Sequence, residues 1–158
     1  MPVDAALFRH TLARLASGVS VLVGREPDGG FIGMTASAVT SLSLEPPMVL
    51  ACVGHAAAAH GALTGGEAFA VNILAAGQEE VSRRFAGLET QRFDGAGLEC
   101  TPGGLPRLDG VLACLEVRRA AVYPGGDHSI VTGVVEWAWA GEGEPLLYVL
   151  GGYRRVTP

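Results

Sequence analysis

The spacing of apolar and polar residues along the chain predicts a protein built mainly from β-strands. Short apolar runs bounded by Gly, Pro, Asp or Glu are typical of strands that lie in a buried sheet. Pro27-Asp28-Gly29-Gly30 is a turn signal and predicts a hairpin between the first two strands. The predicted strands are residues 19–23, a strand that begins at Phe31, and residues 48–53, 68–74, 111–122, 130–140 and 146–150.

Other segments have the spacing of helices. Four apolar residues near the N-terminus recur at helical intervals, and Asp4 can cap the helix that they predict, with Gly18 as its stop. These residues are Leu7, Phe8, Leu12 and Leu15. Residues 56–63 and 78–85 predict two further short helices. Residues 87–110 carry scattered Gly and Pro, and they predict an extended loop.

This order of elements indicates one fold class. An N-terminal helix is followed by mostly antiparallel strands, with two short helices inserted between them. A closed or partly closed, Greek-key-like antiparallel β-barrel suits such a chain, because closure leaves few exposed sheet edges. A length of 158 residues predicts a single domain over residues 1–158.

Composition and charge narrow the classes of function. Hydrophobic residues make up 49% of the chain and charged residues 17%, so a core forms without disulfides, and the apolar surface left over predicts an oligomer. The net charge is −5, and there is no basic stripe that would bind nucleic acid. No apolar run approaches the roughly 20 residues that span a membrane. The N-terminus lacks the order of a signal peptide, so we expect a cytoplasmic protein.

The three cysteines predict neither a zinc site nor a disulfide framework. Cys52, Cys100 and Cys114 are odd in number, widely spaced and form no C-x-x-C pair. Cys52 and Cys114 lie in predicted strands, where a thiol acts as a small buried hydrophobe, whereas Cys100 lies in the predicted loop.

Two histidines that lie close together in the sequence are candidate metal ligands. His55 and His60 are five residues apart, which on a helix places them about 140° apart and on different faces. No carboxylate lies near them in the sequence. We therefore expect no metal site.

A run of small and hydroxyl side chains at residues 33–47 is the first candidate for chemistry. It has no charged residue before Glu45. Strand alternation points Thr35 and Ser37 to the same side, and the hydroxyl residues between positions 40 and 43 are expected in a loop. The run is either a polar edge strand with a serine-rich turn or a shelf on which a flat ligand lies while hydroxyls bind its polar edge; we favour the shelf.

The second candidate is a histidine at a glycine-rich turn. Gly125-Gly126-Asp127-His128 directly precedes the predicted strand 130–140. His128 is either a solvated loop residue or a donor to a bound cofactor or substrate, with Asp127 ordering the turn. Together with the hydroxyl run it suggests a flavin pocket.

The chain has no G-x-G-x-x-G, P-loop or G-x-S-x-G motif in the required context, which disfavours dinucleotide-binding dehydrogenases and hydrolases of those types.

Two further parts of the chain, residues 153–155 and Phe85, each allow two interpretations. Tyr153, Arg154 and Arg155 form either a solvated tail or an aromatic wall and a cationic contact at the rim of a pocket. Phe85 is either a core residue or part of the site.

These motifs together resemble one known family. They comprise Thr35-Ala36-Ser37-Ala38, the serines and prolines of residues 41–47, residues 69–74 and 78–87, Gly126-Asp127-His128 and Gly152-Tyr153-Arg154. The pattern is similar to that of the short-chain flavin reductases, the small reductase components of two-component flavin-dependent monooxygenases. The resemblance extends from Phe8 to Arg155.

The resemblance implies a fold and an activity. We expect an FMN-binding split β-barrel that binds FMN or FAD, assembled as a homodimer with flavin at the subunit interface. The enzyme would transfer hydride from NADH or NADPH to flavin N5, and the reduced flavin would diffuse to a separate oxygenase. The alternatives are a non-catalytic FMN-binding protein and an oxidoreductase that retains its FMN and reduces another acceptor.

The resemblance also implies roles for individual residues. Those that would contact flavin are Thr35, Ala36 and Ser37 along the isoalloxazine ring, Ser41 toward the ribityl and phosphate side, Ala51, Cys52 and Val53 through their backbones, and Phe85 beside the phosphate. His128 would contact nicotinamide or flavin, and Tyr153 and Arg154 would close the nicotinamide site.

One stretch departs from the family pattern. Residues 54–60 lack the hydroxyl groups that bind the flavin phosphate in family members. We expect backbone N–H groups at the start of the next helix to bind the phosphate instead, with assistance from a protonated His55.

Overall fold

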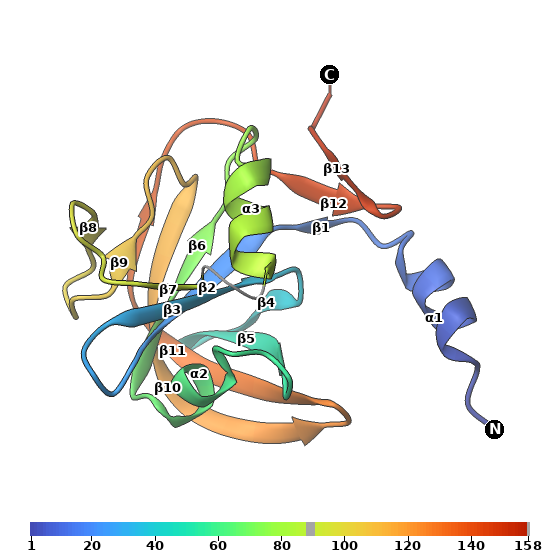
Figure 1. Cartoon of the computed structure of the whole chain (residues 1–158), viewed down its shortest axis with the longest axis horizontal. Helices are drawn as coiled ribbons and strands as arrows, with labels where there is room; N and C mark the ends of the chain where they lie inside the picture. Colours follow the sequence, from blue (N-terminus) through green and yellow to red (C-terminus); the bar gives the residue numbers. More distant parts are fainter. Residues whose placement is uncertain (88–90, 158) are drawn as a thin grey trace.

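An eight-stranded antiparallel sheet forms the body of the protein in the computed structural model, which describes residues 1–87 and 91–157 (Figure 1). The sheet curves into a partly open barrel with β4 and β7 at its two edges. In spatial order its strands are β4 (Val39–Leu44), β5 (Pro47–Gly54), β11 (His128–Ala140), β10 (Ala113–Gly125), β6 (Ala68–Ile73), β2 (Ser20–Arg25), β3 (Phe31–Ala36) and β7 (Arg92–Phe93). The predicted mainly β split-barrel class is confirmed.

The remaining elements lie around this sheet. The helices are α1 (Ala5–Leu12), α2 (His60–Gly65) and α3 (Glu79–Ala86). The first strand of the chain, β1 (Ser17–Gly18), joins β12 (Leu147–Val149) and β13 (Gly152–Arg154) in a three-stranded sheet beside α3 (Figure 1). A small pair is formed by β8 (Glu99–Cys100) and β9 (Pro106–Arg107).

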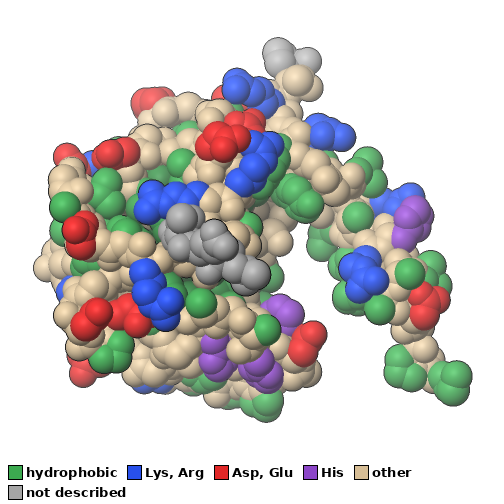
Figure 2. Space-filling model, viewed as in Figure 1, with side chains coloured by type: hydrophobic (Ala, Val, Ile, Leu, Met, Phe, Trp, Pro, Cys, Tyr) green, Lys and Arg blue, Asp and Glu red, His purple; other side chains and the backbone are tan. Residues whose placement is uncertain are grey.

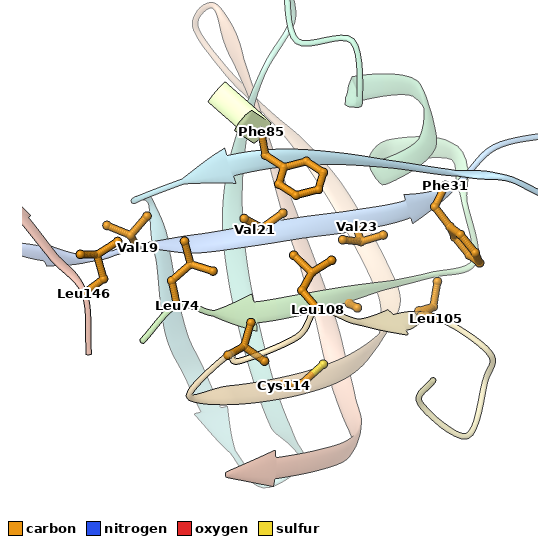
Figure 3. Close-up of a cluster of buried hydrophobic side chains, with 12 residues drawn as sticks. Val19, Val21, Val23, Phe31, Leu74, Phe85, Leu105, Leu108, Cys114 and Leu146 are labelled. Atoms are coloured by element: carbon orange, nitrogen blue, oxygen red, sulfur yellow. The ribbon is translucent and has the colours of Figure 1, made fainter. Parts of the chain in front are cut away.

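The core is divided between the two faces of the sheet. In β2, Val21 and Val23 contribute to one cluster and Leu22 to the other, because successive strand residues point to opposite faces. The first cluster packs under α3 and the loop that carries Leu108 (Figure 3). Burial on both faces explains why β2 and β6 read as nearly continuous apolar runs.

The N-terminal helix stands away from the barrel (Figure 1). Asp4 caps it as predicted, since its Oδ1 accepts a hydrogen bond of 2.9 Å from the backbone N–H of Leu7. The helix ends at Leu12 rather than near Gly18, which belongs to β1. The apolar residues Leu7, Phe8, Leu12 and Leu15 remain between 44% and 70% exposed.

Three sequence-based expectations were wrong in detail. Residues 40–43 form part of strand β4 and not a loop, because pairing with β5 satisfies the backbone of this exposed edge. Helix α2 begins at His60 and not at residue 56, since residues 55–59 form turns. The expected loop 87–110 contains the short strands β7, β8 and β9, while its residues 88–90 lie outside the described residues.

The long β10–β11 hairpin places one candidate residue at its tip. Its two strands pair from Ala113 with Ala140 to Gly125 with His128, with two irregularities in register. Gly126 and Asp127 form the two-residue turn, and Gly126 has a φ of +68°, a conformation that glycine adopts at little cost.

Among the helices that the structure describes, we find none with the length and apolar character needed to cross a membrane.

Candidate active site

Hydroxyl groups from three parts of the chain surround one small cavity. Thr35 comes from the end of β3, Ser37 directly follows that strand, and Tyr153 comes from β13. The cavity has a volume of about 220 Å³. Its other lining residues are Val19, Ser82, Ala86 and Tyr148. The structure therefore brings Thr35, Ser37 and Tyr153 together, as the sequence predicted, although more than 110 residues of chain separate Ser37 from Tyr153.

Helix α3 is tied to this cavity by hydrogen bonds on two sides. The Oγ1 of Thr35 donates a hydrogen bond of 2.6 Å to the backbone carbonyl of Ser82. The Oγ of Ser82 lies 2.8 Å from the phenolic oxygen of Tyr153, within a hydrogen bond. Ser82 is only 1% exposed, and both bonds are partly buried, where a hydrogen bond is stronger than in water.

Tyr153 is packed between an aromatic ring and a cation. The Tyr148 ring meets it edge to face at a centroid distance of 5.4 Å. The guanidinium carbon of Arg83 lies 5.2 Å from the Tyr153 ring centroid, within the range of a cation–π contact. The two tyrosines face each other across the β12–β13 hairpin, whose turn residues Leu150 and Gly151 both have positive φ.

Strand β5 supplies the backbone next to Ser37. The side chains of Ala51 and Val53 are buried in the barrel, whereas Cys52 points outward and is half-buried. The N–H of Cys52 donates a hydrogen bond of 2.9 Å to the carbonyl of Ala38. Because backbone groups alternate along a strand, the N–H of Gly54 is directed to the same side, beyond the end of β4. This N–H is a donor that the sequence-based analysis did not single out.

The histidine of the hairpin, His128, begins β11 and lies beside the end of β5. His128 pairs with Gly54, and a Cβ built at Gly54 would sit 3.6 Å from its Nε2. The Nδ1 of His128 lies 2.7 Å from Oδ1 of Asp127, and the side chain is about half exposed. This hydrogen bond lowers the pKa of the Asp127 carboxyl below its usual value, with a further lowering from the charge of His128. The backbone carbonyl of Asp127 also accepts a hydrogen bond of 2.9 Å from the N–H of His55.

The structure corrects the expectation that His55 and His60 point apart. Their rings meet edge to face at 5.3 Å, because residues 55–59 are turns and not the helix from which the 140° separation was calculated. His60 is also within hydrogen-bond distance of the Ser129 hydroxyl, at 2.9 Å. Histidine side chains gather on this face of the barrel (Figure 2). The Asp127 carboxylate is also nearby in space, where the hydrogen bond and charge of His128 lower its pKa and the charge of His55 adds to this lowering. No group in the described part of the chain has the composition of a metal site.

The other predicted residues lie outside the cavity. Ala36 is buried at the end of β3, and Ser41 is exposed on β4 opposite Val49. Phe85 is 1% exposed and packs among Val21 and its neighbours, which supports the core interpretation of its side chain (Figure 3). Arg154 is exposed, and its guanidinium donates a hydrogen bond of 2.8 Å to the carbonyl of Tyr153.

Two polar residues that line the cavity, Ser82 and Tyr148, were missed from the sequence. Ser82 lies in the segment 78–87 that shares the family pattern, but nothing in that segment signals a buried hydroxyl. Tyr148 belongs to a short strand that was predicted, but no pattern distinguished its side chain from an ordinary strand residue.

Comparison of the chain with known proteins identifies its family. Residues 12–157 match the model of the flavin reductase like domain. The chain belongs to the flavin reductase family. The match includes every residue of the cavity and the whole β10–β11 hairpin, so the flavin reductase resemblance predicted from sequence motifs is confirmed.

Individual relatives cover almost the whole chain. The reductase component of 4-hydroxyphenylacetate 3-monooxygenase from Thermus thermophilus is 46% identical over 151 residues, which is 95% of each chain. An FMN reductase (NADH), SmoA, from Agrobacterium fabrum is 36% identical over 95% of this chain and 85% of its own. The NADH:FAD oxidoreductase SgcE6 from Streptomyces globisporus, solved with NAD and FAD fragments, has a TM-score of 0.90 at 37% identity, covering 98% of this chain and 94% of that one.

The chemistry of the cavity fits a flavin ring. Its polar lining consists of the hydroxyl groups of Thr35, Ser37 and Ser82 and of two tyrosines, and among the described residues no ionised side chain lines it. Hydroxyls donate to and accept from the carbonyl and N–H groups along the edge of an uncharged heterocycle. The backbone donor at Gly54 and the imidazole of His128 lie outside this lining, side by side on the paired strands β5 and β11.

Proposed function

We propose that this protein is an NAD(P)H-dependent flavin reductase that binds FMN or FAD along the cavity and the adjoining end of β5, and supplies reduced flavin to a separate oxygenase. The observation that carries the proposal is the convergence of Thr35, Ser37 and Tyr153 on one uncharged cavity in a chain of this family. Relatives named as NADH-dependent FMN and FAD reductases support the same reaction and favour NADH as the hydride donor.

Each proposed residue has a role in binding or orientation. A bound flavin supplies the redox chemistry by accepting hydride from reduced nicotinamide. Thr35 and Ser37 hold the polar edge of the ring system, and the N–H groups of β5 add backbone donors. Tyr153 forms the wall that orients the nicotinamide, while Arg154 lies at the rim, and His128 contacts nicotinamide or flavin through Nε2, the nitrogen that Asp127 leaves unengaged. No proton donor of unusual pKa is needed for this reaction, which agrees with the absence of paired carboxylates in the cavity lining.

The remaining predicted residues have supporting roles in this proposal. The backbones of Ala36, Ala51, Cys52 and Val53 form the floor on which the ring lies. Ser41 and His55 would contact the ribityl and phosphate groups of the flavin. Phe85 supports this floor from the core, and its buried ring does not contact the flavin phosphate.

Homodimerisation is part of the proposal. Helix α1 presents Leu7, Phe8 and Leu12 to solvent, Leu15 follows it, and Leu42 and Leu44 on the edge strand β4 are also exposed. Exposed apolar surface of this kind on a helix that leaves its own barrel is typical of a contact with a second copy (Figures 1 and 2). Replacing Leu7 and Leu12 by Ser should convert a dimer into a monomer in light scattering, whereas Thr11→Ala should leave the mass unchanged. A wild-type monomer would refute this part.

One assay tests the activity itself. The purified protein is mixed in air with NADH or NADPH and with catalytic amounts of FMN or FAD, and the loss of reduced nicotinamide is followed. Turnover that increases with added flavin supports the reductase. Tightly bound flavin with no turnover indicates a non-catalytic FMN-binding protein, and rapid reduction of bound flavin without reduction of added flavin indicates a different acceptor.

A further inference from the structure

Ser82 occupies a position that helix formation alone does not explain. It is one of the two buried residues of α3, beside Phe85, and it is 1% exposed. Serine is a poor residue for the interior of a helix, where its hydroxyl competes for backbone groups. Here the hydroxyl leaves its own helix and bonds to the phenol of Tyr153 at 2.8 Å.

The same residue is held through its backbone. Its carbonyl accepts the 2.6 Å hydrogen bond from Thr35, so the position of Ser82 is set by strand β3. A chain of hydrogen bonds therefore runs from Thr35 through Ser82 to Tyr153, and all three residues line the cavity. These hydrogen bonds connect the phenol of Tyr153, in the small sheet β1–β12–β13, to the barrel and restrict where it can lie.

The other contacts of Tyr153 are less directional. Tyr148 meets its ring at an interplanar angle of 67°, and Arg83 lies over its face. Both contacts are compatible with a range of ring rotations, because aromatic and cation–π attractions vary slowly with geometry. The hydrogen bond to Ser82 is the contact that fixes the direction of the phenol among those described for this side chain.

We propose that Ser82 is a positioning residue for nicotinamide binding: it holds Tyr153, through its hydroxyl, in the orientation in which the ring forms one wall of the nicotinamide site. This inference rests on the proposed function. Ser82 acts on nicotinamide through Tyr153, because its hydroxyl is engaged by the phenol. Without the bond, Tyr153 must be ordered when the nicotinamide binds, and immobilising one such side chain reduces affinity roughly two- to twelvefold.

The test is a double-mutant cycle on the two hydroxyls. Ser82→Ala and Tyr153→Phe each remove one partner and keep the neighbouring shape, and the double variant removes both. The dissociation constant of NAD⁺ is measured by calorimetry on the flavin-loaded protein, together with KM and kcat for NADH. We expect each single variant to weaken NAD⁺ binding by the same factor, within two- to twelvefold, and the double variant to weaken it no further. KM should rise while kcat changes less than twofold.

A matched control separates this role from a loss of stability. Thr101→Ala removes another buried hydroxyl, which accepts a hydrogen bond of 3.1 Å from the N–H of Leu105 far from the cavity. It should leave the affinity for NAD⁺ unchanged even if the melting temperature falls. Melting temperatures of all variants are recorded for comparison.

The possible outcomes are distinct. Equal affinities in wild type, Ser82→Ala and Tyr153→Phe, or effects of the two substitutions that add in the double variant, would overturn the positioning role. A loss in Thr101→Ala equal to that in Ser82→Ala would also overturn it. Absence of NADH turnover in the wild type would instead overturn the proposed reductase function, and the NAD⁺ binding cycle would still decide the role of Ser82.

Discussion

The Nδ1 of His128 is held 2.7 Å from Oδ1 of Asp127, so the ring is oriented by the residue that precedes it. With Nδ1 engaged by a carboxylate, Nε2 is the nitrogen left on the side of Gly54, next to the backbone of β5. A histidine held in this way presents one defined nitrogen to a ligand, which is how a carboxylate fixes the tautomer of an imidazole.

Substitution of this histidine should affect catalysis more than stability. We expect His128→Ala to lower kcat/KM for NADH roughly tenfold, as for the loss of one hydrogen bond to a ligand, because its side chain is half exposed and packs little. Steady-state kinetics with added FMN measures the effect. His10→Ala, on the exposed helix α1, is the control, and turnover of His128→Ala at the wild-type rate would contradict the role.

The Asp127 carboxyl should titrate at a lower pH than an ordinary aspartate. Its pKa is lowered below 3.8, first by the hydrogen bond from His128. A lowered folded-state pKa means that the contribution of this pair to stability is complete above the ordinary pKa and is lost as pH falls through the lowered one. NMR titration of the carboxyl carbon should show this midpoint, and in His128→Ala the midpoint should return toward 3.8. A midpoint that does not move in the variant would exclude the pair as its cause.

Gly33 should tolerate no side chain. A Cβ there would lie 2.6 Å from Cδ1 of Phe85 and 3.2 Å from Cγ1 of Val21, inside the core cluster. We expect Gly33→Ala to reduce the free energy of unfolding by about 1–3 kcal/mol, the usual effect of overpacking. Urea denaturation measures the change. Gly61→Ala, where a Cβ has open space within helix α2, should instead be neutral or stabilising by up to about 1 kcal/mol.

The three cysteines should react in the order of their exposure. Burial raises the pKa of the Cys114 thiol to about 11, so at pH 8 only about one molecule in a thousand carries the reactive thiolate. Cys100 is exposed and Cys52 is half-buried. We expect iodoacetamide to modify Cys100 first, Cys52 more slowly and Cys114 only after unfolding, as followed by peptide mass spectrometry. Early modification of Cys114 in the native protein would contradict this order.

The turn of the β12–β13 hairpin offers a stabilising substitution. Leu150 has a φ of +53° and is exposed, and Gly151 follows with +73°. Two positive φ values in a two-residue turn are those of a type I′ turn, which favours Asn-Gly. Leu150→Asn should slow hydrogen exchange of the β12 and β13 amides by up to about tenfold, since a branched residue in this region costs roughly 1–2 kcal/mol. Unchanged or faster exchange would show that the turn is not strained.

The sequence indicated most of the barrel because its inner strands are buried on one or both faces. Alternating or continuous apolar residues located β2, β5, β6, β10 and β11 within a few residues. Strand β4 was missed because it is an edge strand with exposed hydroxyl residues, so its pattern is the same as that of a serine-rich loop. The short strands β7–β9 have two residues each, too few to form a pattern.

The candidate site was predictable where its residues lie in motifs. Thr35, Ser37, His128 and Tyr153 all occur in recognisable segments, and the structure places three of them around one cavity. Ser82 also lies in a recognisable segment, 78–87, but its role could not be predicted, because it depends on a contact with a residue 71 positions away. The meeting of His55 and His60 was predicted wrongly for a similar reason, since their geometry depends on a turn and not on a regular helix.

The small sheet β1–β12–β13 has a consequence for how loss of activity should be interpreted. Its strands have two or three residues each, and it carries Tyr148 and Tyr153 without belonging to the eight-stranded barrel. Short strands with few backbone hydrogen bonds open at a fraction of the free energy needed to unfold the whole domain. Mild heat or denaturant would therefore dismantle the cavity wall while the barrel stays intact. For this enzyme, the temperature at which catalysis fails and the temperature at which the fold fails are two separate properties.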